Sequence, residues 1–537
     1  MRRVSRRSLT GWALLFFPIH CLAVEVVVHT NRTIHPRFQG PGFHVFSHLH
    51  PHSEEEFEQI LGKRWVELEP AFARVTHWWD SVDPVRAKPE SRGKLVQWLR
   101  FFARRTGTLV YLTTWNPPVL QRPEDRDQYA RVVAEELEFL LHAGATNLRY
   151  YCMTNELTFG QWGAWLKDLP DFADFHRRIH RALRARRVSV GLLATDASPI
   201  QHWPTLEWAA RHMSRFTAVY GAHHYFNEHE LEDLNFYEWF YRWCRWAVQI
   251  ARSQGKEFLI GEFGARQDGR VRNGKHWDAC IYWDTPKEPL VGIQLAEAVL
   301  AAMNAGVWAM AYWTFTDFPD AYSDRYANKW GVFRWADDGW RPRAVYYAYG
   351  LLTKFFHGPG VVYTVSVSQP MVRAAAMRRG QASWTVAVVN RSSRAEDLVL
   401  RFRGIPYQGR FRKYVYDPER VPMTEDGDLH SWSALVPMQD GQLIDTLPAG
   451  ALVIYTTMYD EEPPLPPTNV RARALEDGVW EIHWEASPSG DVSYYRVYRD
   501  GLRVGSSITT RFVDRSAKGR AGVYRVAAVD RSGNTSP

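Results

Sequence analysis

Two glutamates in this sequence stand at the ends of apolar runs that have the composition of buried β-strands. Glu156 follows LRYYCMT and a single amide, Asn155, and Glu262 lies near the end of EFLIGEF. An ionisable group is costly to bury, so its placement where a buried strand ends indicates chemistry. Two carboxyl groups about 5 Å apart, one on each side of a glycosidic bond, can cleave that bond with retention of configuration. One donates a proton to the leaving oxygen, and the other attacks the anomeric carbon.

The surroundings of each glutamate suggest which role it takes. A nucleophilic carboxylate must stay ionised, whereas the proton donor needs a raised pKa, which an apolar site and a second carboxylate supply. Glu156 follows a buried strand and has only a neutral amide beside it. We therefore expect Glu156 to be the general acid/base and Glu262 the nucleophile.

The segments that must position these residues alternate between short apolar runs and amphipathic stretches from about residue 38 to 355. Such alternation predicts a parallel sheet with helices on both faces. Eight repeats fit a closed (β/α)8 TIM barrel better than an open doubly wound sheet, and no GxGxxG follows the first strand. The expected strands span residues 42–46, 72–78, 108–115, 148–154, 188–195, 216–224, 257–263 and 307–315.

In a barrel of this type, functional residues lie where the strands end. Glu156 ends the fourth expected strand and Glu262 the seventh, and these two strands face each other across the mouth. The helix-like stretches between strands support the same fold, and several end in a glycine that suits a left-handed C-cap. They cover residues 94–107, 123–144, 172–186, 238–255 and 291–306.

The pattern changes after the barrel. Residues 359–458 alternate with period two between turn residues, which predicts an antiparallel β-sandwich. Residues 459–467 contain DEEPPLPP, a stiff solvated linker. Residues 468–537 again form short alternating strands, and YRVYRDG followed by YRVAAVDRSGNTSP resembles a fibronectin type III module. The barrel domain is expected to occupy residues 24–358.

The first 23 residues predict export. They combine a basic start, a short apolar stretch and Ala23, which is typical of a signal peptide, and SRRSLT is similar to a twin-arginine signal. We therefore expect a secreted or periplasmic protein with no membrane span after cleavage. The net charge of +7 includes four arginines in this segment, so the remaining chain is nearly balanced and nucleic acid binding is not supported.

Further residues fall in register with the glutamate pair: Arg74 in ARVTHWW, His223 and Tyr225 in AHHY, and Trp313 in YWTF. Together with Asn155 and the two glutamates, they resemble glycoside hydrolase clan A, most closely family 39 or family 5. The resemblance implies that Asn155 forms a hydrogen bond with the sugar 2-hydroxyl and that Tyr225 orients the nucleophile. It implies that the Trp313 ring forms the base of the sugar-binding subsite. It also implies that Arg74 and His223 belong to the substrate-binding site. The implied activity is a retaining glycosidase acting on β-linked oligo- or polysaccharides, with no cofactor and no metal.

Other interpretations stay open. One alternative is a metal-dependent amidohydrolase barrel, with ligands from His48, His50, His223 or His224, and Asp317. The ends of the fourth and fifth strands, Asn155-Glu156 and Thr195-Asp196, do not supply the ligands that such a site needs.

The aromatic residues and the two β domains would also suit a non-catalytic carbohydrate-binding or adhesion protein. Taken singly, each glutamate, Arg74, His223 and Trp313 has a structural explanation as an ion pair or core residue. Four further aromatic residues lie near strand ends, where they would either line additional sugar subsites or pack in the core: Trp78, Trp79, Tyr111 and Trp115.

Overall fold

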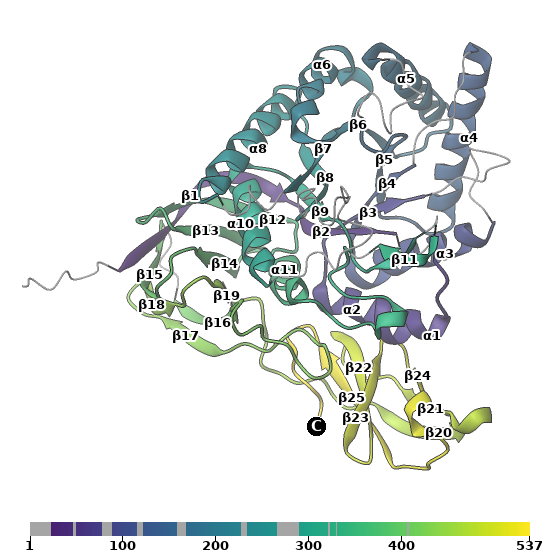
Figure 1. Ribbon diagram of the computed structural model, residues 1–537, viewed down its shortest axis with the longest axis vertical. Coiled ribbons are helices and arrows are strands. Elements are labelled where there is room, and N and C mark those ends of the chain that lie inside the picture. Colours follow the sequence, from purple (N-terminus) through teal and green to yellow (C-terminus); the bar gives the residue numbers. More distant parts are fainter. Residues whose placement is uncertain are drawn as a thin grey trace, which may run out of the picture.

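A computed structural model describes residues 23–46, 50–77, 89–114, 122–157, 168–226, 233–265, 289–320, 323–328, 330–404 and 408–537. Figure 1 shows a helix-ringed barrel, a large β-sheet beside it and a small β module, drawn in yellow, below both. The proposed signal peptide, His48, Trp78, Trp79 and Trp115 lie outside the described residues. Within those ranges, no helix has the length and apolar character needed to cross a bilayer.

The described residues close a barrel of eight parallel strands, which confirms the predicted fold class. Every expected strand is present, and most of their residues are buried because helices cover the outside and side chains fill the inside. The barrel strands are β2 (Gly40–Val45), β3 (Phe72–Thr76), β4 (Leu109–Thr113), β5 (Leu148–Cys152), β6 (Gly191–Ala197), β7 (Val219–Phe226), β8 (Phe258–Ala265) and β9 (Ala309–Tyr312).

Local sequence explains where the surrounding helices begin and end. One has Pro123 in its first turn, with Glu124 and Asp125 beside the positive end of the helix dipole. Another ends at Gly306, whose φ of 91° lies in the left-handed region that glycine adopts readily because it has no Cβ. The helices are α1 (Glu54–Glu56), η2 (Phe57–Leu61), α2 (Gly62–Leu68), α3 (Pro89–Phe101), η3 (Phe102–Thr106), α4 (Pro123–His142), α5 (Leu169–Ala185), α6 (Thr205–His212), α8 (Phe236–Ser253), α10 (Leu290–Ala305) and α11 (Ala344–Phe355).

Helix α10 is buried along almost its whole length because it is enclosed by the barrel, by α8 and α11, and by the neighbouring β-sheet. That sheet has the order β17-β16-β19-β14-β13-β12-β1-β15-β18 among the described residues. Its strands are β1 (Val24–Phe38), β12 (Gly360–Val367), β13 (Val372–Arg379), β14 (Ser383–Asn390), β15 (Glu396–Arg403), β16 (Gly409–Tyr416), β17 (Ala434–Met438), β18 (Gln442–Leu447) and β19 (Leu452–Thr456). The edge strands β17 and β18 meet through a bridge between Gln439 and Gln442, so the sheet curls over its own apolar core.

Strand β1 belongs to this sheet although its residues fall in the range 24–358 that the sequence assigned to the barrel. It pairs antiparallel with β12 and parallel with β15, and Val24, Val26 and Val28 are fully buried in the core of the sheet. The period-two pattern of VEVVV marks a strand but does not reveal its partners. The chain therefore enters through the β-sandwich before it begins the barrel.

The last module consists of two three-stranded sheets, β20-β21-β24 and β23-β22-β25, packed over a core that includes Ile482, Trp484 and Phe512. Its strands are β20 (Thr468–Ala474), β21 (Trp480–Glu485), β22 (Val492–Arg499), β23 (Leu502–Ser507), β24 (Arg511–Asp514) and β25 (Tyr524–Asp530). This confirms a β domain at the end of the chain, while its kinship with fibronectin type III stays a prediction.

This module is docked on the barrel rather than tethered to it. Tyr494 and Ile508 join the hydrophobic core of the barrel, and the Ile508 amide donates to the Glu58 carbonyl at 3.1 Å. Arg105 also donates to the carbonyl of Ser493 at 2.7 Å. The contacts hold η2 and η3 against the module.

A buried ion cluster joins the three units at Asp428, which follows β16 in the sandwich domain. Its carboxylate contacts Lys63 Nζ from α2, Arg503 Nη1 at 2.7 Å and Arg496 Nη2 at 3.1 Å. Burial acts to raise the pKa of Asp428, but the charges of Lys63 and Arg503 lower it well below its usual range. The carboxylate is therefore ionised at neutral pH.

We expect Asp428→Asn to destabilise the protein by about 3–5 kcal/mol, because removing one partner of a buried network leaves the remaining charges unmatched. The matched control is Asp426→Asn, since Asp426 pairs with the same Arg503 at 2.7 Å but its side chain is 47% exposed. An exposed pair contributes at most about 1 kcal/mol. Urea or thermal unfolding of both variants measures the difference, and equal effects would contradict the assigned importance of the cluster.

Candidate active site

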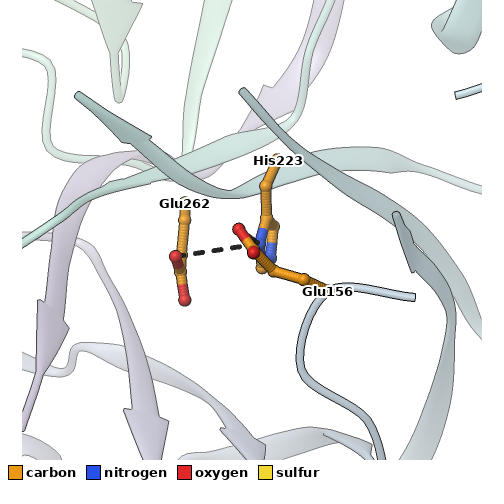
Figure 2. Close-up of side chains that lie close together, drawn as sticks. All are labelled: Glu156, His223 and Glu262. Carbon is orange, nitrogen blue, oxygen red and sulfur yellow. Dashed lines mark hydrogen bonds and ion pairs between the residues drawn. The ribbon is translucent and has the colours of Figure 1, made fainter. Parts of the chain in front are cut away.

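Glu156 and Glu262 converge at the carboxyl-terminal end of the barrel, as Figure 2 shows. Glu156 follows β5 and Glu262 lies in β8. One carboxylate oxygen of each glutamate and one ring nitrogen of His223 all lie within 4.8 Å of one another. The two acidic side chains that the sequence placed on opposite walls are therefore close enough to act on a single bond.

Glu156 sits where the backbone turns sharply after its strand. Its φ is 52°, in the left-handed region that a residue with a Cβ rarely adopts, and the next amide, Leu157, donates to the Asp196 carbonyl at 3.0 Å. This conformation directs the chain away from the strand while the side chain stays at the mouth. The Glu156 side chain is 18% exposed, compared with 4% for Glu262.

Glu262 is surrounded by hydrogen-bond donors. Arg74 Nη1 donates to Oε1, and the Tyr225 hydroxyl donates to Oε2 at 2.5 Å. Burial raises the pKa of Glu262 above its ordinary value, while the charges of Arg74 and His223 and the Tyr225 hydrogen bond oppose that rise. We interpret Glu262 as the anion of the pair, because the guanidinium at Oε1 stays charged and gains most from an ionised partner.

Arg74, on β3, is fully buried and is shared by several partners. Its Nη2 donates to Asn155 Oδ1 at 2.7 Å and to Asp196 Oδ2 at 3.1 Å, and its Nη1 lies 2.9 Å from His44 Nδ1. The Asn155 side-chain oxygen accepts a hydrogen bond from Arg74. The Asn155 side-chain nitrogen is therefore the atom that can donate a hydrogen bond to a ligand. Arg74 therefore fixes the orientation of Asn155 as well as the position of Glu262.

His223, on β7, lies between the two glutamates. Its Nδ1 is 3.5 Å from Glu156 Oε1 and 3.8 Å from Glu262 Oε2, and its Nε2 is 2.8 Å from Asp196 Oδ1. Burial acts to lower the pKa of His223, but the Asp196 and Glu262 carboxylates outweigh it and raise the pKa to about 9. At neutral pH the imidazole is thus positively charged.

Trp313 follows β9 and packs in a group of rings that includes His44, Phe46 and Phe318. Its ring centroid lies 4.2 Å from that of His44, and Phe46 and Phe318 pack around it at 6.1 and 6.2 Å. The side chain is only partly buried, so one region of it remains accessible. Tyr225 is held from another direction by Trp330, with centroids 5.1 Å apart.

All seven residues predicted for the site therefore lie around the mouth of the barrel, and the structure adds two that the sequence did not single out. His44 on β2 contacts Arg74 and Thr76, and Asp196 on β6 contacts Arg74 and His223. A polar residue inside an apolar strand, as in GFHVF, was the available signal for His44. Tyr111 is a packed residue, since it is fully buried with its hydroxyl donating to Asp196 at 2.8 Å.

Two described side chains of the metal-site alternative, those of His50 and Asp317, have other partners. Asp317 accepts two hydrogen bonds from Arg343, at 2.9 and 2.7 Å, and the buried His50 ring stacks on Phe318 with centroids 5.0 Å apart. Burial lowers the pKa of His50 to about 4. Neither Asp317 nor His50 joins the groups of potential metal ligands that the described residues form.

Comparison with known proteins connects this barrel to solved glycoside hydrolases. A family 30 subfamily 8 xylanase from Clostridium acetobutylicum is 13% identical and aligns over 80% of this chain and 99% of its own, with a TM-score of 0.56. A bacterial orthologue of human α-L-iduronidase is 14% identical over 96% of this chain and 98% of its own, with a TM-score of 0.59. A family 51 α-L-arabinofuranosidase from Thermotoga petrophila RKU-1 is 13% identical over 81% of this chain and 100% of its own, also with a TM-score of 0.59.

At these identities the likeness establishes the fold, so the barrel expected from the clan A resemblance is confirmed and membership of family 39 or 5 stays a prediction. No protein-family model matches the chain. A curated α-amylase from Niallia circulans is 34% identical over 79 residues, which are 14% of this chain and 6% of the amylase. The chain thus spans only a small part of the length of that relative.

The raised pKa of His223 predicts a specific pH dependence of stability. A group whose pKa is about 9 when folded and 6.5 when unfolded stabilises the fold fully below pH 6.5, and this contribution is lost as the pH rises to 9. At about 1.4 kcal/mol per pH unit, the loss is about 3 kcal/mol. Urea unfolding at pH 6.5 and 9 should show this decline in the wild type and not in His223→Gln.

The exposed His212, at the end of α6, provides the control. His212→Gln should follow the pH dependence of the wild type, because its ring does not belong to the buried cluster. A His223→Gln variant with the same decline as the wild type would contradict the charge assigned to His223.

Proposed function

We propose that this chain is a retaining glycoside hydrolase in which Glu262 is the nucleophile and Glu156 the general acid/base. The observation that carries the proposal is the convergence of the two carboxylates, with oxygens within 4.8 Å at the mouth of the barrel. Retaining enzymes hold their two carboxyl groups about 5–5.5 Å apart, whereas inverting enzymes keep about 6.5–9.5 Å to admit a water molecule. The separation here favours direct attack by a carboxylate.

The distribution of donors supports the two roles. Glu262 receives hydrogen bonds from Arg74 and Tyr225, which stabilise the carboxylate that must attack. Glu156 is more exposed, and access to solvent suits a group that must first give a proton to the leaving oxygen and then take one from water. When two neighbouring carboxyl groups have opposite environments, the difference usually decides which one acts as the acid and which as the nucleophile.

The reaction then proceeds by two displacements. Glu262 attacks the anomeric carbon, the glycosidic C–O bond breaks, and Glu156 transfers its proton to the departing oxygen. In the second step, Glu156 takes a proton from water, the water oxygen bonds to the anomeric carbon, and the ester bond to Glu262 breaks. Both carboxyl groups return to their starting protonation states.

The remaining residues fit the recognition of one sugar ring. The amide nitrogen of Asn155 is directed by Arg74 and is placed to bond a sugar hydroxyl, and the accessible part of Trp313 offers an aromatic surface for stacking. The glycoside hydrolases that share the fold support a carbohydrate substrate, and we propose β-linked oligo- or polysaccharides. Export through the N-terminal segment would place the enzyme where such polymers occur.

The decisive variant is Glu262→Gln, which should lower kcat by at least about 10⁴-fold while leaving the fold intact, because an amide cannot form the glycosyl ester. The matched control is Glu257→Gln. Glu257 immediately precedes the same strand, but it is 39% exposed and pairs with His35 at the opposite end of the barrel. Assays on a panel of aryl glycosides and polysaccharides measure both variants.

A polysaccharide that binds without being cleaved by the wild type would instead favour the non-catalytic carbohydrate-binding alternative. A stoichiometric bound metal that is essential for turnover would favour the metal-dependent alternative. Either result would overturn the proposed roles of the two glutamates.

Glu156→Ala should affect substrates according to their leaving groups. General acid catalysis is worth about 10²–10⁴-fold, so glycosides with poorly acidic leaving groups should lose about that factor. Aryl glycosides with activated leaving groups need little protonation and should lose much less in the first step. Similar, mild losses for both substrate types would contradict the assignment of Glu156 as the acid.

A further inference from the structure

Asp196 is a buried carboxylate that has no role in the double displacement described above. It ends β6, is fully buried, and has a left-handed backbone with φ of 60°. The Tyr111 hydroxyl donates to Oδ1 at 2.8 Å, Arg74 Nη2 donates to Oδ2 at 3.1 Å, and His223 Nε2 lies 2.8 Å from Oδ1. One side chain thus joins both cations that contact the glutamates.

The charges around Asp196 explain why a carboxylate is needed. Arg74 and His223 carry two positive charges, and Glu262 as the nucleophile and Asp196 carry two negative charges. These charges balance when Glu156 holds the proton that its proposed role as the acid requires. Without the charge of Asp196, the cluster would carry an unmatched positive charge on the buried side chains of Arg74 and His223, at a cost of several kcal/mol. Either His223 or Glu156 can restore the balance by losing a proton, because a guanidinium does not deprotonate in proteins. His223 is the group whose Nε2 loses the carboxylate that lies 2.8 Å away.

The position of His223 gives this proton a use in catalysis. Its Nδ1 is almost equally far from the two glutamates, 3.5 Å from Glu156 Oε1 and 3.8 Å from Glu262 Oε2. In the free enzyme the negative charge resides on Glu262, and once Glu262 is esterified it resides on Glu156. A cation between the two can stabilise that charge in both states without moving.

We propose that Asp196 is a positioning residue that keeps His223 protonated between the two glutamates, so that one imidazolium serves as counter-ion for both halves of the reaction. This inference rests on the proposed glycosidase function. Asp196 acts through His223 and Arg74 and takes no part in bond formation. The described titratable and charged groups that face Asp196 or His223 are Arg74, Tyr111, Cys152, Glu156 and Glu262, and Tyr225 donates to Glu262.

The direct test is the titration of His223 in the whole protein, followed by NMR of ¹⁵N-histidine and assigned by comparison with His223→Gln. In the wild type, the ring should keep its proton to about pH 9. In Asp196→Asn, the midpoint should fall by two units or more, a loss of at least about 100-fold in proton affinity. Asp317→Asn removes another buried carboxylate near the mouth and should leave the midpoint unchanged.

A wild-type midpoint near 6.5 or below would overturn the proposal even if Asp196→Asn failed to fold, and so would an unchanged midpoint in that variant. Kinetics provide a second measurement. In Asp196→Asn, kcat and kcat/KM on an aryl glycoside should both fall by at least about tenfold, and the alkaline limb of the pH profile should move to lower pH. Asp196→Glu, which keeps the charge, should recover part of both.

A merely structural role would lower stability in Asp196→Asn without moving the alkaline limb, and that result would also overturn the proposal. The NMR measurement needs no substrate, so the two proposals can fail separately. If the wild type cleaves no glycoside but His223 titrates as expected, the catalytic function and the counter-ion role are wrong, and only the effect of Asp196 on the protonation of His223 stands. If glycosides are cleaved while His223 titrates alike with and without Asp196, only the role of Asp196 is wrong.

Discussion

A buried guanidinium must be matched by buried negative charge, and at Arg74 this requirement organises the mouth of the barrel. Its partners come from several different strands: His44 from β2, Asn155 after β5, Asp196 from β6 and Glu262 from β8. Each of these groups would be costly to bury alone. Because they satisfy one another, the barrel can hold two carboxylates within reach of one bond without losing its closed geometry.

The surrounding units pack against the barrel that holds this arrangement. Helix α10 is enclosed between the barrel and the curled sheet, and the last module packs Tyr494 and Ile508 into the core of the barrel. The ion cluster at Asp428 joins α2, the sandwich and this module through Lys63 and Arg503. A site that depends on contacts of about 3 Å between strands benefits from such support, since small displacements weaken electrostatic stabilisation sharply.

Much of this could be predicted from the sequence because it depends on local patterns. Apolar runs with regular spacing marked all eight barrel strands, and Glu156 and Glu262 stood out as acidic residues at the ends of two of them. Strand β1 was harder to place, since alternation along VEVVV reports a strand but not the sheet that it joins. Asp196 was visible in ATDA, yet a lone carboxylate at a strand end has no meaning until its partners on β3 and β7 are known.

The sequence by itself determined the order of strands and helices, the change to β domains after the barrel, and the two acidic residues most suited to chemistry. These follow from hydrophobic periodicity and from the cost of burying charge, which act on short segments. Only the tertiary structure decided which charges meet: that Arg74 is shared by Glu262 and Asp196, and that His223 lies between both glutamates. Such contacts join residues far apart in the chain, and their energies depend on distances and burial that closure of the barrel alone sets.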